Sequence, residues 1–166
     1  MRAYEYRHVV AFEETNLVGN VYYVSHLSWQ GRCRELFLKE KAPGVLAEIR
    51  HGLSFVTTRC SCEYLAELSA FDEVAVRMTL GSLGQSRMQL HFEYWRQIPE
   101  GGEELVAHGE QHVACMRRDG DRLVPVPLPE GLRQALLVYE PKSVGTPPLA
   151  PAAPGGPIKL ADGEAS

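Results

Sequence analysis

The stretch FEETNLVGNVYYVSHLSWQGRCRELFL, residues 12–38, decides the fold of this chain. It opens with a turn-rich segment, passes through one glycine at position 19, and continues as a long helical pattern. The segments that follow Leu53 read as strands. Residues 12–38 therefore contain the one long helix available to fill the concave side of a sheet.

The helical part of this stretch has two sides of unequal width. On a projection that starts at His26, polar residues share a narrow arc and apolar residues occupy the broad opposite side. The narrow arc contains Ser28, Arg32, Glu35 and Lys39, and the broad side contains Leu27, Trp29, Cys33, Leu36, Phe37 and Leu38.

Three polar residues lie within the apolar arc. His26, Gln30 and Arg34 are spaced i, i+4, i+8 and form a ridge along the helix. Burying a guanidinium without partners is costly, so Arg34 requires a carboxylate, carbonyl groups or an anionic ligand. The alternatives are a structural ion pair with Glu63 or Glu67, or a place in a subunit interface.

Length and charge limit the class of protein. The chain has 166 residues, which is typical of one domain with a sizeable core, and its net charge is −4 without a basic cluster. Nucleic acid is therefore not expected as a ligand. The first residues lack the apolar run of a signal peptide, and no segment reads as a membrane span.

The four cysteines predict a reducing environment. Cys33, Cys60, Cys62 and Cys115 show no CxxC spacing. Without an export signal they read as reduced thiols in a cytoplasmic protein.

Alternating apolar residues predict five strands around the long helix. The expected strands are residues 4–12, 53–68, 72–80, 88–94 and 103–117. This order indicates an α+β fold in which a long antiparallel five-stranded sheet wraps round one central helix. An uncovered sheet face and edge predict a homo-oligomer, formed through edge pairing or back-to-back sheets.

The second of these strands carries the side chains nearest to the helix. Its alternation places Val56, Cys60, Cys62 and Tyr64 on the inner face and Thr57 on the other.

The end of the chain differs in composition from the rest. Residues 130–139 read as a last helical turn or two, which gives a domain of residues 1–140. Residues 141–166 are rich in Pro, Gly and Ala and read as a disordered tail.

No metal or cofactor site is predicted. His108 and His112 have a spacing that suits a metal on a helix, but their neighbours are strand-like. On a strand, four residues span roughly 13 Å, which is too far for one metal. Nucleotide-binding motifs are also missing from the sequence.

Several motifs together resemble one family. Residues 15–23, the segment HLSW that begins at His26, and the pair Arg34-Glu35 resemble the turn-and-helix signature of hotdog-fold thioesterases of the 4-hydroxybenzoyl-CoA thioesterase type. Residues 62–65 and 71–76 resemble two later strands of that family. The likeness covers residues 4–130 and implies a hotdog fold and thioester hydrolysis.

One position departs from the family's pattern. Asn16 stands where these thioesterases have a catalytic aspartate, and an amide cannot act as general base or nucleophile near neutral pH. Asn16 combined with Arg34 resembles the thioesterases that accompany enediyne polyketide synthases. Those enzymes release a polyunsaturated polyketide from an acyl carrier protein. The family more often has tyrosine where this chain has His26.

The resemblance implies catalytic roles based on hydrogen-bond donors. The backbone N–H of Tyr23 is expected to face the thioester carbonyl, and Asn16 to orient water or that carbonyl. Arg34 is expected to stabilise developing charge or to hold the carboxylate of a β-keto acid before it loses carbon dioxide. His26 is expected to assist proton transfer, or else to be a polar wall residue.

The substrate-binding residues follow from the same reading. Helix N-terminal N–H groups are expected to point into the pocket beside Gly19, with Tyr22 next to it. Trp29 and Phe37 are expected to form an apolar floor, with Phe55 and Tyr64. Thr57 is the strand residue expected beside Arg34.

Three functions are compatible with these residues. The first is release of a polyunsaturated β-keto polyketide from the acyl carrier protein domain of an iterative synthase, by a dimer of dimers. The second is general acyl-CoA hydrolysis, which requires a carboxylate near the thioester and for which Glu63 and Glu67 are distant candidates. The third is a hotdog protein that binds acyl chains or carrier proteins without catalysis.

Overall fold

The computed structural model describes residues 2–141. The tail predicted at 141–166 lies almost entirely outside the described residues. The elements follow in the order β1 (Tyr4–Val9), the 3-10 helix η1 (Phe12–Glu14), α1 (Val24–Lys41), α2 (Pro43–Arg50), β2 (Leu53–Tyr64), β3 (Glu73–Leu83), β4 (Arg87–Gln97), β5 (Glu103–Asp119), β6 (Arg122–Pro125) and α3 (Glu130–Leu137).

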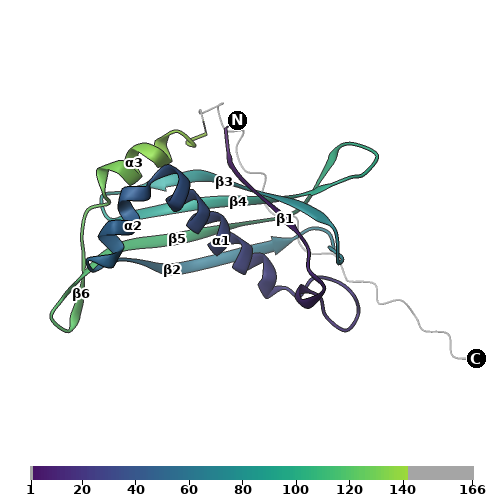
Figure 1. Cartoon of the computed structure of the whole chain (residues 1–166), viewed down its shortest axis with the longest axis horizontal. Coiled ribbons are helices and arrows are strands. Elements are labelled where there is room, and N and C mark those ends of the chain that lie inside the picture. The colour runs from purple at the N-terminus through teal and green to yellow at the C-terminus, as the bar shows by residue number, and fades with distance from the viewer. Residues whose placement is uncertain (1, 142–166) are drawn as a thin grey trace, which may run out of the picture.

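One antiparallel sheet carries the fold, with the strand order β1-β3-β4-β5-β2. Helix α1 crosses one face of this sheet, and α2 and α3 lie near the C-terminal end of α1 (Figure 1). The predicted arrangement of a long antiparallel sheet around one helix is confirmed. A short sixth strand, β6, adds to the five predicted and pairs with the end of β5. Strand β6 was not predicted from the sequence, because it ends in a proline-rich segment and proline is tolerated only at strand ends and edges.

The core lies between α1 and the sheet. Trp29, Cys33 and Phe37 of α1 are almost completely buried. The Phe37 ring meets Tyr4 of β1 and Tyr139 after α3 edge-on, with ring centroids 5.5 and 5.7 Å apart. Burying one such side chain contributes about 1.5–3 kcal/mol. Among residues 2–141, no helix is long and apolar enough to cross a membrane.

A β-bulge in β2 changes which side chains face the helix. The pairing with β5 shifts between Thr57 and Arg59. An extra residue reverses the alternation of a strand. Phe55 and Thr57 therefore face α1 before the bulge, and Cys60 and Cys62 face α1 after it. The prediction that Val56 faces inward and Thr57 outward is therefore wrong. Cys60 is also exposed, because β2 is an edge strand.

Glycine is required where α1 approaches the sheet. The Nε2 of Gln30 donates to the carbonyl of Ser61 at 2.9 Å, and Gln30 reaches β2 directly over Gly109 of β5. A Cβ at position 109 would collide with that carbonyl oxygen and lie 2.6 Å from the Gln30 amide nitrogen. The bare backbone at Gly109 thus lets a fully buried amide join helix and edge strand.

We expect Gly109→Ala to destabilise the fold by at least about 2 kcal/mol, because backbone or the buried Gln30 must move. Urea unfolding monitored by circular dichroism measures this loss. The matched control is Gly131→Ala in α3, where a Cβ meets no atom within 4 Å. That control should leave stability unchanged or raise it by up to about 1 kcal/mol. Equal stabilities of both variants would contradict the close approach at Gly109.

Candidate active site

The turn before α1 is closed by Asn16 and Gly19. The N–H of Gly19 donates to the Asn16 carbonyl at 3.0 Å, and the N–H of Asn16 donates to the Asn20 carbonyl at 2.8 Å. Gly19 has a φ of +92°, which only glycine adopts readily. The Oδ1 of Asn16 accepts the Val18 N–H at 3.1 Å, so the Asn16 amide presents its NH₂ donors outward.

Glu14 binds this turn to the helix, a role that no pattern in the sequence indicates. Its carboxylate accepts hydrogen bonds from the indole N–H of Trp29 and the backbone N–H of Ala11, both at 2.7 Å, and contacts His8 Nε2 at the same distance. Although burial works in the opposite direction, these partners lower the pKa of Glu14. The Glu14 carbonyl also accepts the N–H of Tyr22 at 2.8 Å. The carboxylate therefore serves to hold the turn.

A cavity of about 390 Å³ opens between this turn and the segment that follows β2. It contains four of the predicted site residues, Asn16, Tyr22, Tyr23 and His26. The other lining residues are Asn20, Val21, Tyr64, Leu65, Ala66, Glu67 and Leu68.

The start of α1 supplies a backbone donor to this cavity. Tyr23 is the residue before the first helical position, and within residues 2–141 its N–H donates to no protein acceptor. The Tyr64 hydroxyl donates to the Tyr23 carbonyl at 2.7 Å and fixes this peptide. An N–H at a helix N-terminus is suited to stabilise a developing negative charge.

His26 is buried against the cavity without hydrogen-bond partners. It is 3% exposed, and in the described part of the chain neither ring nitrogen has a partner. The rings of Trp29, Tyr64 and Tyr94 surround it at centroid distances of 4.9–5.4 Å. Burial lowers the pKa of His26 to about 4, against a smaller opposing effect of the Tyr23 backbone. The imidazole is therefore neutral at neutral pH and is a weak base.

Unpartnered polar atoms concentrate at this site. Within residues 2–141, the buried side-chain nitrogen and oxygen atoms without a hydrogen bond belong to Asn20, His26 and Gln30. Two of these residues line the cavity, and the third is the next member of the ridge on α1. Because buried polar groups are normally paired, this concentration indicates a place built to receive polar groups of a ligand.

Arg34 is held by two neutral groups. Its Nη1 donates to Thr57 Oγ1 and to Gln111 Oε1, both at 3.0 Å. The predicted proximity of Thr57 and Arg34 is thus confirmed. The alternative of an ion pair with Glu63 or Glu67 is wrong, since Glu63 pairs with His108 and Glu67 accepts a hydrogen bond from Asn20.

Arg34 does not line the cavity of Asn16. It lies eight residues beyond His26 on the same helix, about 12 Å along the axis. The structure of one chain therefore brings Asn16, Tyr22, Tyr23 and His26 together, and places Arg34 and Thr57 further along the ridge.

Three predicted substrate-binding residues lie elsewhere. Trp29 and Phe37 are 2% and 1% exposed and belong to the core, so the prediction that they form the pocket floor is wrong. They occupy the flank of α1 that faces β1, whereas the ridge faces β2. Gly19 shapes the turn and does not line the cavity. Tyr64, which follows the β2 bulge, does line the cavity.

One carboxylate lies at the cavity. Glu67 lines it and accepts a hydrogen bond from Asn20 Nδ2 at 3.0 Å. Glu67, which the sequence offered only as a distant candidate base, thus lies at the same cavity as Asn16.

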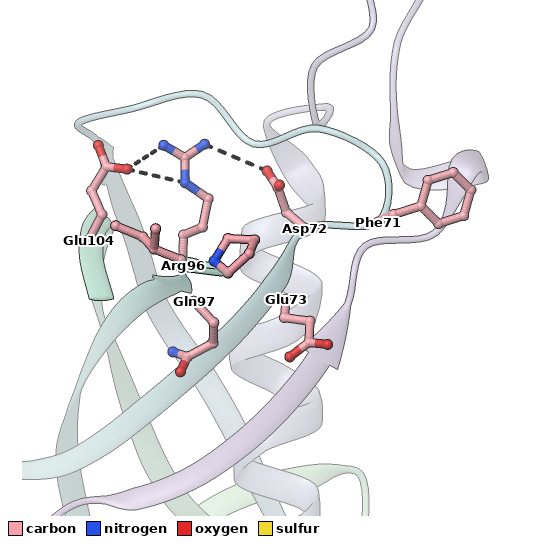
Figure 2. A pocket seen from close by; sticks show the side chains of 8 residues that line it. Phe71, Asp72, Glu73, Arg96, Gln97 and Glu104 are labelled. Atoms are coloured by element: carbon pink, nitrogen blue, oxygen red, sulfur yellow. Dashed lines mark hydrogen bonds and ion pairs between the residues drawn. The ribbon is translucent and has the colours of Figure 1, made fainter. Parts of the chain in front are cut away.

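Another cavity, of about 550 Å³, lies where the start of β3 meets the β4–β5 hairpin. Figure 2 shows Arg96 between Asp72 and Glu104, and Phe71 pointing away from them. The cation of this cavity, Arg96, is already paired with two carboxylates of its lining. In the described residues, no group of histidine, cysteine and carboxylate side chains is arranged to hold a metal ion.

Comparisons with known proteins show the family to which this fold belongs. The model of the thioesterase-like superfamily matches residues 10–136. The chain is similar to dynemicin thioesterase, whose crystal structures reveal induced-fit and allosteric effects upon polyene binding. The identity is 51% and the TM-score 0.82, over 86% of this chain and 100% of that chain.

Two further solved structures show the same fold at lower identity. One is a variant of 4-hydroxybenzoyl-CoA thioesterase in complex with 4-hydroxybenzoyl-CoA, with 16% identity and a TM-score of 0.73 over 82% of this chain and 99% of that chain. The other is a 1,4-dihydroxy-2-naphthoyl-CoA thioesterase from Synechocystis, with 18% identity and a TM-score of 0.67 over 82% and 96%. No curated protein matches the chain significantly.

The buried His26 predicts a pH dependence of stability. In the folded chain it stays neutral down to about pH 4, whereas in the unfolded chain it protonates near 6.5. Between these values the unfolded state binds more protons, so stability falls as the pH drops, by on the order of 3 kcal/mol in total.

The measurement is urea unfolding at several pH values from 7 to 4 for the wild type and His26→Phe. Carboxylates contribute equally to both proteins, so the difference between them isolates His26. We expect the variant to lose this part of the slope. Parallel curves would show that His26 is protonated in the folded chain.

Proposed function

The chain belongs to the thioesterase-like superfamily and is a thioester hydrolase, and we propose that it releases a polyunsaturated β-keto polyketide from an acyl carrier protein in enediyne biosynthesis. The 51% identity to dynemicin thioesterase, which binds a polyene, supports this substrate class. The observation that carries the proposal is the cavity itself, where Asn16, Tyr23 and the neutral His26 lie together without an aspartate at position 16. All four cysteines are free thiols, which fits a cytoplasmic enzyme.

Hydrolysis here rests on donors that stabilise the oxyanion. A water oxygen attacks the thioester carbon, and the negative charge gathers on the carbonyl oxygen. The C–S bond then breaks, and the proton lost by the attacking water passes to the leaving sulfur, so that the thiol and the acid are released. The N–H of Tyr23 and the NH₂ of Asn16 border the same cavity and supply donors to that oxygen. A thioester is already activated, so attack by a positioned water requires no strong base.

His26 orients the water and does not act as the principal base. A general base works best with a pKa near the operating pH, and burial keeps the pKa of His26 near 4. A neutral imidazole still offers one donor and one acceptor. Its unpartnered nitrogens are therefore suited to hold the water beside the carbonyl carbon.

Arg34 interacts with an anionic part of the substrate. Its guanidinium is held by neutral groups, so its charge is available for the β-keto carboxylate formed by hydrolysis or for developing charge. A carboxylate held in this way is placed for the loss of carbon dioxide that follows release.

Oligomerisation places Arg34 within reach of the thioester. Strand β2 is the edge of the sheet, and Thr57 and Tyr64 lie at different points along it. Antiparallel pairing of two β2 edges about a two-fold axis reverses this order, so that Arg34 of one copy approaches the Asn16 cavity of the other. In the proposed dimer of dimers, this pairing of β2 edges forms each of the two dimers.

A second function is favoured by Glu67. Because its carboxylate lines the cavity, it offers a base for a general acyl-CoA thioesterase. Its hydrogen bond from Asn20 holds it at the cavity wall. The two functions differ in whether Glu67 is needed for the chemical step.

We expect Asn16→Ala and Arg34→Ala each to lower the single-turnover rate of acyl-carrier thioester hydrolysis about 10²-fold or more, as for the loss of an oxyanion donor. Glu67→Gln should stay within about threefold of the wild type, since the proposed reaction uses no carboxylate base. The matched control for the helix is Arg32→Ala, on the solvent side of α1. A rate loss confined to Glu67→Gln would favour the general acyl-CoA enzyme.

Mixing two inactive variants tests the shared site. If Asn16 and Arg34 act across the interface, Asn16→Ala and Arg34→Ala chains refolded together should recover about a quarter of the wild-type activity, because half of the dimers then hold one intact site. Each variant refolded alone should stay inactive. Absence of recovery in a mixture shown to exchange subunits would place both residues in the same chain's site.

A further inference from the structure

Gln111 has no role in the reaction described so far, although it is buried beside Arg34. It lies on β5 opposite Cys60 and Leu90, on the face of the sheet that α1 covers. The residue is 4% exposed. Its Oε1 accepts a hydrogen bond from Arg34 Nη1 at 3.0 Å. A buried amide on this face needs such a partner, since an unpaired one costs about 1–3 kcal/mol.

Gln111 and Thr57 use the same nitrogen of Arg34. Both accept from Nη1, which has two hydrogens, so this nitrogen is fully engaged. Within residues 2–141, Nε and Nη2 of Arg34 have no protein acceptor. Nη1 therefore fixes the planar guanidinium, and the edge formed by Nε and Nη2 can bind two oxygens of a carboxylate.

The chemistry of position 111 also decides the charge at the site. A glutamine oxygen accepts a hydrogen bond without adding charge, whereas a glutamate would form an ion pair with Arg34. Burial already disfavours the charged form and lowers the pKa of Arg34. Keeping the cation without a counter-ion has a free-energy cost, and an anionic ligand removes that cost.

We propose that Gln111 is a positioning residue, which orients the Arg34 guanidinium and keeps it uncompensated for an anionic group of the substrate. The proposal rests on the proposed function, in which Arg34 meets the substrate. Gln111 itself acts only through Arg34. This role requires that the acyl group of the substrate carries or develops negative charge near Arg34.

A double-mutant cycle tests this role. We expect Gln111→Leu to lower the single-turnover rate about tenfold or more, the effect of losing one hydrogen bond to a charged group. The double variant Arg34→Ala, Gln111→Leu should be no slower than Arg34→Ala alone, because Gln111 acts through Arg34. Additive losses, or a wild-type rate for Gln111→Leu, would overturn the proposal.

A second variant covers the case in which Gln111→Leu fails to fold. Gln111→Glu keeps the size and the acceptor and adds a charge, so we expect it to retain the wild-type melting temperature or exceed it while losing at least tenfold in rate. A structural role for Gln111 predicts the wild-type rate for this variant. The control is Gln85→Glu in the exposed turn between β3 and β4, which adds the same charge at an exposed position.

The failure of each proposal gives a different pattern. If Arg34→Ala has the wild-type rate, the catalytic role of Arg34 is wrong, and with it the proposed function. If Arg34→Ala is inactive and both Gln111 variants are normal, only the positioning role is wrong.

Discussion

The structure depends on a line of polar side chains pressed between a helix and the edge of a sheet. His26, Gln30 and Arg34 lie on the inner side of α1, and each must find a partner there or remain unpaired. Gln30 reaches a carbonyl of β2 over a glycine, and Arg34 reaches two neutral groups on β2 and β5. His26 has no partner in the described chain. The unmet bonding capacity along this line is available to a ligand.

The proposed mechanism accounts for asparagine in place of aspartate at position 16. An amide at position 16 gives up a base and contributes donors, and the N–H at the start of α1 adds another. A carboxylate at position 111 would neutralise Arg34, and the chain has glutamine there. A neutral amide thus stands at each end of the line, Asn16 at the cavity beside His26 and Gln111 as an acceptor beside Arg34.

The sequence predicted the elements of this fold well because their periodicity is strong. Turn, helix and strands follow the patterns of residues 12–38 and of the alternating segments, and the ridge on α1 emerged from helical spacing alone. The β2 bulge carries no signature in the letters, so the inner face of that strand was assigned wrongly before Arg59. Gln111 was missed because an isolated polar residue in a strand gives no sign of its partner.

The width of the apolar arc on α1 limited the prediction of the pocket. Two flanks of one helix meet different parts of the sheet, and hydrophobicity does not distinguish them. Trp29 and Phe37 therefore read as pocket residues, although they pack toward β1. Glu14 was missed for a similar reason, since a glutamate in a turn gives no sign that it will bind an indole and two further groups.

The most direct test of the central claim is a crystal structure with an acyl-pantetheine analogue in which an amide replaces the thioester. We expect its carbonyl oxygen to accept hydrogen bonds from the Tyr23 N–H and the Asn16 amide. Arg34 should contact a ligand oxygen through Nε or Nη2, with Nη1 still bound to Thr57 and Gln111. A Glu67 carboxylate beside the carbonyl carbon, with Arg34 paired to a protein carboxylate, would contradict the account.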